Sequence, residues 1–161
     1  MTHVEPRDAF PDEIDALATI WFDGWHDAHA TLVPGELARE RTLESFRDRM
    51  RAGLADARTI GDRRAPLGFT MLKADELYQF YVARAARGTG VAAQLMADAE
   101  QRLAARGVAT AWLACAIGND RAARFYEKQA WRRAGTVVYL AETSTGVIPL
   151  DVWRYEKSLP T

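Results

Sequence analysis

The sequence has one cysteine, almost no net charge and no long apolar run, and each shortage removes a class of protein. Cys115 is alone among 161 residues, so the chain can form no internal disulfide and offers no cysteine cluster for a metal. The formal net charge of −1 gives no basic footprint, so we expect no nucleic-acid partner. No apolar run approaches the roughly 20 residues of a membrane span, so we expect no membrane partner either.

The length and the N-terminal residues set two further expectations. A chain of 161 residues favours one domain over residues 1–161, and a hydrophobic content of 48% suffices for a sizeable core. Residues 1–6 do not resemble a secretory signal peptide, which makes the cytoplasm the expected location.

One stretch has the pattern of a buried strand that turns through glycines into a helix. Residues 77–82 are mostly aromatic and β-branched, which favours a strand, whereas residues 91–96 are rich in Ala, Leu and Met, which favours a helix. An Arg-Gly-Thr-Gly turn over residues 87–90 separates them. Such a turn directs backbone N–H groups and the positive end of the helix dipole at one place, so the sequence predicts a phosphate site.

Two known phosphate loops fit this turn poorly. A P-loop ends in Gly-Lys followed by Ser or Thr, whereas two apolar residues follow Gly90. The dinucleotide fingerprint is matched by Gly88, Gly90 and Ala93, but it requires an acidic residue about 20 positions later, at the end of the next strand. The predicted strand at residues 109–116 contains no acid, which leaves a nucleotide-dependent oxidoreductase as a remote alternative.

A third pattern, Arg/Gln-x-x-Gly-x-Gly/Ala, is matched by Arg87, Gly90 and Ala92. Downstream, residues 119–126 read Asn-Asp-Arg-Ala-Ala-Arg-Phe-Tyr, and an aromatic-ended turn follows. Together these segments resemble the pyrophosphate loop and the Asn-x-x-Ala-x-x-Phe-Tyr segment of the GNAT superfamily of N-acetyltransferases, which use acetyl-CoA. The resemblance covers residues 68–131 well, and the flanks only by the order of strands and helices.

The resemblance and the residue patterns together imply an α/β fold of GNAT type. We expect a central mixed, mostly antiparallel sheet of about six or seven strands with one splayed parallel pair, flanked by about four helices. The first helix is expected to start near Asp12 as its N-cap. The strands are predicted at residues 57–61, 67–72, 77–82, 108–116, 135–140 and 148–155.

The resemblance also assigns a cofactor site. The CoA pyrophosphate would bind the amides of the glycine turn, and the pantetheine arm would lie between the strands that end near Val82 and Ala116. Asn119 would form a hydrogen bond with that arm. The family commonly has a proline where this chain has Arg84, which predicts a looser turn that still binds CoA. The implied cofactor-binding residues are Val82, Ala83, Arg87, Gly88, Thr89, Gly90, Val91, Ala92 and Asn119.

Two residues are the predicted catalytic groups. By the resemblance Tyr126 would lie near the thioester sulfur, and a phenol with a pKa of about 10 is protonated at neutral pH and can donate to a departing thiolate. The alternative role of Tyr126 is a core aromatic on a helix. By the same resemblance, Glu76 at the start of the central strand is the predicted general base, since some GNAT enzymes place a glutamate on this strand. Its alternatives are a solvated acid without a role, His29 or Asp75 as the base, and a water chain with no single base.

By the resemblance, the first helix borders the acceptor pocket. Trp25 and His29 share one face of that helix and are the predicted acceptor-binding residues, with core packing and solvation as their alternatives. Trp21 is expected in the core and His26 in solvent. The predicted activity is acetyl transfer from acetyl-CoA to a primary amine of a small molecule or peptide, by direct attack in a ternary complex without a metal. The alternative is a non-catalytic acyl-CoA-binding regulatory domain. The late strands offer an edge for a possible homodimer.

Overall fold

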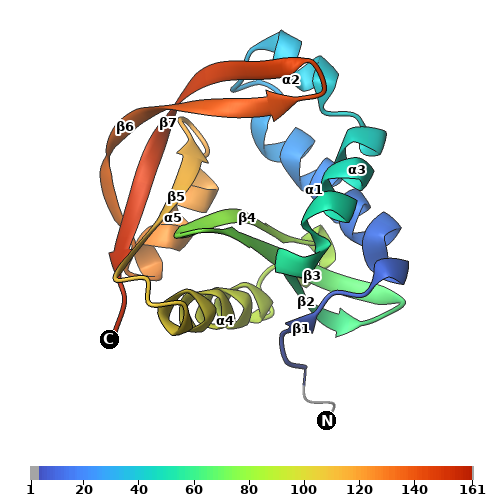
Figure 1. Cartoon of the computed structure of the whole chain (residues 1–161), viewed down its shortest axis with the longest axis vertical. Coiled ribbons are helices and arrows are strands. Elements are labelled where there is room, and N and C mark those ends of the chain that lie inside the picture. Colours follow the sequence, from blue (N-terminus) through green and yellow to red (C-terminus); the bar gives the residue numbers. More distant parts are fainter. Residues whose placement is uncertain (1–3, 161) are drawn as a thin grey trace.

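The computed structural model describes residues 4–160, and its centre is a seven-stranded sheet in the order β1-β2-β3-β4-β5-β7-β6 (Figure 1). Every neighbouring pair is antiparallel except β4 and β5, which run parallel. This confirms the predicted mixed sheet with one parallel pair. The strands are β1 Arg7–Asp8, β2 Ala57–Asp62, β3 Ala65–Lys73, β4 Glu76–Val82, β5 Thr110–Ala116, β6 Arg132–Thr143 and β7 Gly146–Ser158.

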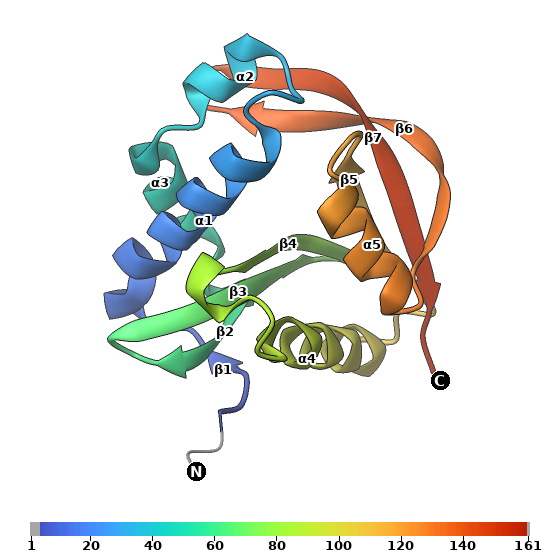
Figure 2. The same cartoon turned by 180° about the vertical axis from the view of Figure 1, so that it is seen from behind.

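The helices cover both faces of this sheet, with α1 and α3 on one side of β3 and β4 and α4 on the other (Figures 1 and 2). Residues 4–160 contain five α-helices, one more than expected, because the short α2 carries no long apolar periodicity. The first helix begins later than predicted, since Asp12 lies in a 3-10 turn and Glu13 is the N-cap. The helices are α1 Ile14–His29, α2 Gly35–Glu40, α3 Leu43–Gly53, α4 Val91–Ala105 and α5 Asp120–Lys128.

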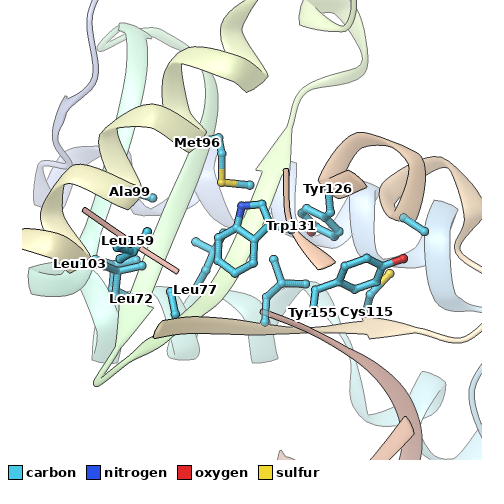
Figure 3. Packing of buried hydrophobic residues seen from close by; sticks show 13 residues of the cluster. Leu72, Leu77, Met96, Ala99, Leu103, Cys115, Tyr126, Trp131, Tyr155 and Leu159 are labelled. Atoms are coloured by element: carbon cyan, nitrogen blue, oxygen red, sulfur yellow. The ribbon is translucent and has the colours of Figure 1, made fainter. Parts of the chain in front are cut away.

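Two main apolar clusters fill the space between the sheet and the helices. On the α1 and α3 side, the Trp21 ring lies 5.1 Å from Phe46 and 5.4 Å from Phe69, and all three side chains are fully buried. On the α4 and α5 side, a second cluster includes Met96, Trp131 and residues of β5 and β7 (Figure 3). Among residues 4–160, no helix is both long and apolar enough to cross a membrane.

The parallel pair β4 and β5 meets at one register position, Glu76 opposite Trp112. The strands separate beyond it, which agrees with the predicted splay. On the other side of β4, Leu72 pairs with Leu77 and Met71 with Gln79, so the intervening Tyr78 forms a bulge. A bulge reverses the side-chain alternation of a strand, which lets two consecutive side chains face the same side.

Gly24 in the middle of α1 allows that helix to approach β4 closely. A Cβ atom at this position would lie 2.6 Å from Cδ1 of Tyr81, a separation at which the ring would have to move. This contact sets the distance between α1 and the central strand. The side chains of the last turn of α1 are therefore held against β4.

The long strand β6 forms one edge of the described sheet, and its side chains Val138 and Leu140 are more than half exposed. An exposed strand edge can pair with a second chain. The homodimer therefore stays a prediction, and the edge of β6 is a surface at which two chains could pair.

A buried carboxylate links β1 to the start of α1. Glu13 is fully buried, and its two oxygens accept hydrogen bonds from Arg7, each at 2.8 Å. Glu13 Oε1 also accepts from the Phe10 backbone N–H at 3.0 Å.

We expect Glu13→Ala to lower the free energy of unfolding by about 1–3 kcal/mol, because it leaves the Phe10 N–H without its partner and the Arg7 guanidinium with backbone carbonyls alone. Urea unfolding followed by circular dichroism would measure the change. Glu44→Ala is the matched control, since Glu44 pairs with Arg47 on the exposed surface and should cost no more than about 0.5 kcal/mol. Equal effects of the two changes would show that the Glu13 contacts do not stabilise this corner.

Candidate active site

The glycine turn leads from the end of β4 into α4. Gly88 and Gly90 have φ angles of +78° and +88°, which favour glycine, and Gly90 is the N-cap of α4. The first helical hydrogen bond runs from Gln94 N to Gly90 O. Within residues 4–160, the N–H groups of residues 90–93 have no acceptor, so they are available to an anion at the helix N-terminus.

Backbone hydrogen bonds support the turn around Arg84, the residue found where the family commonly has a proline. Arg84 begins a 3-10 turn, Arg84–Ala86, and Ala86 N donates to Ala83 O at 2.9 Å. Ala83 N in turn donates to Leu67 O of β3 at 2.8 Å. The looser turn predicted from the missing proline is therefore held by backbone hydrogen bonds.

Three arginines surround a single carboxylate beside this turn. Asp27 of α1 contacts Arg84 at 3.0 Å, Arg121 at 3.3 Å and Arg87 at 3.5 Å. The hydrogen bond from Arg121 is the main reason that the pKa of Asp27 lies below its usual value. Three guanidinium groups around one carboxylate leave an excess of positive charge. Sequence reasoning missed Arg84 and Arg121, although Arg84 lies three positions before Arg87 and Arg121 lies in the first turn of α5.

A cavity of about 360 Å³ opens between β4 and β5, where the two strands separate. We call it the β4–β5 cavity. Ala83 lies in an adjoining hollow, the side chain of Val91 is buried beneath the turn, and Thr89 and Gly90 lie outside the cavity wall. The predicted cofactor residues that do line it are Val82, Arg87, Gly88, Ala92 and Asn119.

Tyr126 faces the β4–β5 cavity from α5 and is almost fully buried. Burial raises the pKa of its phenol, so the group is protonated at neutral pH. Its hydroxyl has no hydrogen-bond partner among residues 4–160, whereas its ring packs beside Phe80 and Tyr155. The ring of Tyr126 therefore packs in the core, and its unpaired hydroxyl remains a proton donor at the cavity.

Asn119 and Cys115 line the same cavity. Asn119 Oδ1 accepts from Ala122 N at 3.4 Å and caps α5, and its amide NH₂ has no partner among the described residues. Burial raises the pKa of the Cys115 thiol to about 12, so it is protonated at neutral pH. The cavity thus offers neutral donors rather than a thiolate nucleophile.

A second cavity of about 160 Å³ lies between the helices α1 to α3 and the β6–β7 hairpin. We call it the hairpin cavity. Trp25 and His29 of α1 both line it, and Tyr78 and Gln79 reach it from the bulge of β4. The residues that it shares with the β4–β5 cavity are His29, Tyr78, Gln79, Tyr81 and Ala114. The two cavities therefore meet at the central strands.

The aromatic and histidine residues of α1 separate into different environments. Trp21 is fully buried in the core, as expected. His26 was expected in solvent, but its Nε2 lies 2.6 Å from Arg41 O because α1 packs against the end of α2. Burial lowers the pKa of His29 to about 4, so its imidazole is neutral at the junction of the cavities. Its Nδ1 has no partner among residues 4–160.

Glu76 lies next to the hairpin cavity and lines neither cavity itself. Its side chain is buried, and Tyr139, which does line the hairpin cavity, donates its hydroxyl to Glu76 Oε2 at 3.2 Å. Burial raises the pKa of Glu76 to about 7. The alternative of a solvated acid is therefore wrong. Asp75 is exposed and accepts a hydrogen bond from Trp112 Nε1 at 3.0 Å, outside both cavities.

Residues 14–131 match the family model described as the acetyltransferase (GNAT) family. The chain belongs to this family. Membership confirms the resemblance drawn from the two motifs and supports an acyltransferase. The roles assigned to individual residues stay predictions.

Solved structures with N-acetyltransferase folds agree with this GNAT assignment. An N-acetyltransferase from Staphylococcus aureus Mu50 superposes with a TM-score of 0.74 at 19% identity, covering 99% of this chain and 100% of that one. PaiA N-acetyltransferase from Thermoplasma acidophilum, solved with coenzyme A, gives 0.65 at 18% identity, covering 98% and 99%. YncA from Salmonella typhimurium, solved with its cofactor acetyl-CoA, gives 0.67 at 13% identity, covering 99% and 96%. No curated protein matches the sequence.

The environment of Glu76 makes stability depend on pH. Its folded pKa of about 7 lies above the ordinary glutamate value of about 4.3, so folding favours the protonated form. The stability that this difference contributes is present below pH 4.3 and is lost as the pH rises through 7. Glu76→Gln cannot ionise, so its Tm relative to the unmodified protein should increase between pH 5 and pH 8.

Differential scanning calorimetry at several pH values would measure this Tm difference. Glu142→Gln is the control, since Glu142 is an exposed carboxylate on the rim of the hairpin cavity and pairs with Lys73. Its Tm difference should change little over the same range. A constant Tm difference for Glu76→Gln would contradict the desolvation of this carboxylate.

Proposed function

We propose that the chain is an N-acetyltransferase that transfers the acetyl group of acetyl-CoA to a primary amine of a small molecule or peptide, by direct attack in a ternary complex. The observation that carries this proposal is the meeting of two cavities, one of which ends at an anion-binding turn. A cofactor can occupy the β4–β5 cavity while an acceptor occupies the hairpin cavity, so both can be bound at once.

The free N–H groups of residues 90–93 suit a pyrophosphate, and the arginines around Asp27 add positive charge beside them. The free amide of Asn119 suits a carbonyl of the pantetheine arm. The acetyl thioester supplies an activated acyl group. Support comes from PaiA and YncA, which have the same fold and were solved with coenzyme A and acetyl-CoA.

In the proposed reaction, the amine nitrogen forms a bond to the thioester carbonyl carbon and the carbon–sulfur bond breaks. Tyr126 gives its hydroxyl proton to the sulfur as the thiolate leaves. The protonated state of the Cys115 thiol argues against prior transfer of the acetyl group to that residue. Direct attack on the thioester is therefore favoured over an acyl-enzyme.

The amine must lose a proton, and we propose Glu76 as the group that finally accepts it. A pKa of about 7 makes this carboxylate a base matched to neutral pH. Because Tyr139 stands between Glu76 and the hairpin cavity, the proton passes through the Tyr139 hydroxyl or a water beside it. The neutral imidazole of His29 at the junction is the second candidate, and its low pKa makes it the weaker base.

A non-catalytic acyl-CoA-binding domain is the alternative function. It requires the turn and the β4–β5 cavity but has no use for the unpaired Tyr126 hydroxyl or for a second cavity. Those two features favour the enzyme.

Acetyl-CoA binding should raise the Tm of the purified protein. A ligand at 100 times its Kd adds about 2.7 kcal/mol, which corresponds to roughly 5–10 °C for a domain of this size. Gly90→Ala should abolish this shift, because alanine disfavours the φ of +88° at which this N-cap directs the N–H groups of residues 90–93. Gly107→Ala is matched to it, with φ +84° at the other end of α4 and the same open space, and should keep the shift. A shift with NAD or ATP but not with acetyl-CoA would reject the cofactor assignment.

Tyr126→Phe should lower kcat by about 100-fold with little change in KM for acetyl-CoA, since only the transition state uses the proton. Steady-state kinetics with an accepted amine would measure both constants. Cys115→Ala is the control within the same cavity and should retain kcat to within about threefold. An unchanged kcat for Tyr126→Phe would exclude it as the acid, and loss of turnover in Cys115→Ala would favour an acyl-enzyme.

A further inference from the structure

The hairpin cavity contains a buried guanidinium group that has no carboxylate partner. Arg41 follows α2 and is only 5% exposed. Its Nη1 donates to the backbone carbonyl of Glu142 at 2.6 Å, which joins the end of α2 to the β6–β7 hairpin. Its Nε is buried without a partner, and no carboxylate in residues 4–160 lies within ion-pair distance of it. The Nη1 group of Arg41 thus joins two elements of the fold, whereas its Nε has no hydrogen-bond partner among residues 4–160.

A buried charge without a counter-ion is costly, and proteins rarely keep one without a use for it. Burial lowers the pKa of Arg41 to about 10, so the group is still protonated at neutral pH. Leucine or methionine could fill the same volume without this cost. A guanidinium is distinguished by its planar set of donors, which matches the two oxygens of a carboxylate.

The other charges of the hairpin cavity add to this positive excess. Arg49 lines the cavity, donates to the Tyr78 hydroxyl at 3.0 Å and lies over the Trp21 ring at 4.4 Å. No carboxylate among the described residues pairs with Arg49. The lining carboxylate, Glu142, is exposed at the rim, where it contacts Lys73 at 3.5 Å. The interior therefore presents two cations and no anion.

We propose that the acceptor is a free amino acid with an apolar side chain, and that Arg41 binds its carboxylate. This inference rests on the proposed function and names the class of amine. The cavity has an apolar wall for the side chain of the acceptor. The residues that form this apolar wall are Val33, Leu37, Leu150 and Val152.

The size and position of the cavity fit this class. A cavity of about 160 Å³ is close to the roughly 150 Å³ that accommodates one benzene molecule, so it holds one side chain and not a peptide. The hairpin cavity joins the β4–β5 cavity at His29 and Gln79, where an amine can meet the thioester. The N-terminal residue of a peptide has no adjacent carboxylate, so a free amino acid uses Arg41 and a peptide does not.

Matched pairs of amines test the proposal on the unmodified protein. Each pair is an amino acid and its decarboxylated amine: phenylalanine with 2-phenylethylamine, leucine with 3-methylbutylamine, and tryptophan with tryptamine. Thiol release from acetyl-CoA and the mass of the product measure turnover. We expect kcat/KM to favour the best amino acid over its partner by at least about 100-fold, because an amine without a carboxylate leaves Arg41 unpaired.

Arg41→Gln tests the residue itself and should remove this preference, because KM for the amino acid rises until its kcat/KM no longer exceeds that of the decarboxylated amine. Arg39→Gln is the matched control, since Arg39 lies in α2 two positions before Arg41, is exposed and does not line the cavity. It should keep the full preference. The acetyl-CoA-dependent Tm shift of each variant shows whether its fold and cofactor site are intact.

Three results would overturn the proposal. Decarboxylated amines that react as well as their amino acids would show that no carboxylate is recognised. Failure of every amino acid in the panel, in protein whose Tm rises with acetyl-CoA, would reject the substrate class while leaving the cofactor assignment. Absence of any acetyl-CoA shift in folded protein would reject the proposed function and this inference together. If Arg41→Gln fails to fold, the paired amines still decide the question.

Discussion

Strands β4 and β5 run parallel yet meet at one register position, Glu76 opposite Trp112, and the architecture of the site follows from their divergence. Strands paired along their whole length leave no space between them, whereas these two open a cavity toward their common end. The glycine turn lies at one end of this cavity because it continues β4. Strand β7 pairs with β5 from Thr110 to Ala116 and carries the hairpin toward α2, which adds the wall of the second cavity (Figures 1 and 2).

The charges of the site follow the same arrangement. Positive groups lie at the turn, around Asp27, and in the hairpin cavity, at Arg41, while burial keeps Tyr126, Cys115 and His29 neutral between them. A neutral centre suits an uncharged amine and a thioester, and the positive ends suit the anionic parts of two ligands. Burial thus keeps the centre of the site neutral, while the charged groups lie at its two ends.

Much of the fold and of the glycine turn could be predicted, because the signals are local. The aromatic and β-branched residues of β4, the Gly88 and Gly90 turn and the Asn119 cap depend on neighbours in sequence. Prediction failed where distant contacts decide. The short α2 is too brief to show a periodicity and is held against the hairpin by Arg41. The burial of Glu76 could not be predicted either, since the sequence around a glutamate after a turn is the same whether its side chain is buried or solvated.

The sequence by itself determined the family, the order of strands and helices, and the backbone of the glycine turn, since each depends on residues within one short segment. The tertiary structure decided which side chains line the same cavity and which of them are charged there. Tyr139 meets Glu76, and Arg41 meets Glu142, only because the hairpin folds back over the sheet. Burial then sets each pKa, because the free energy of a charge depends on the groups that surround it in space.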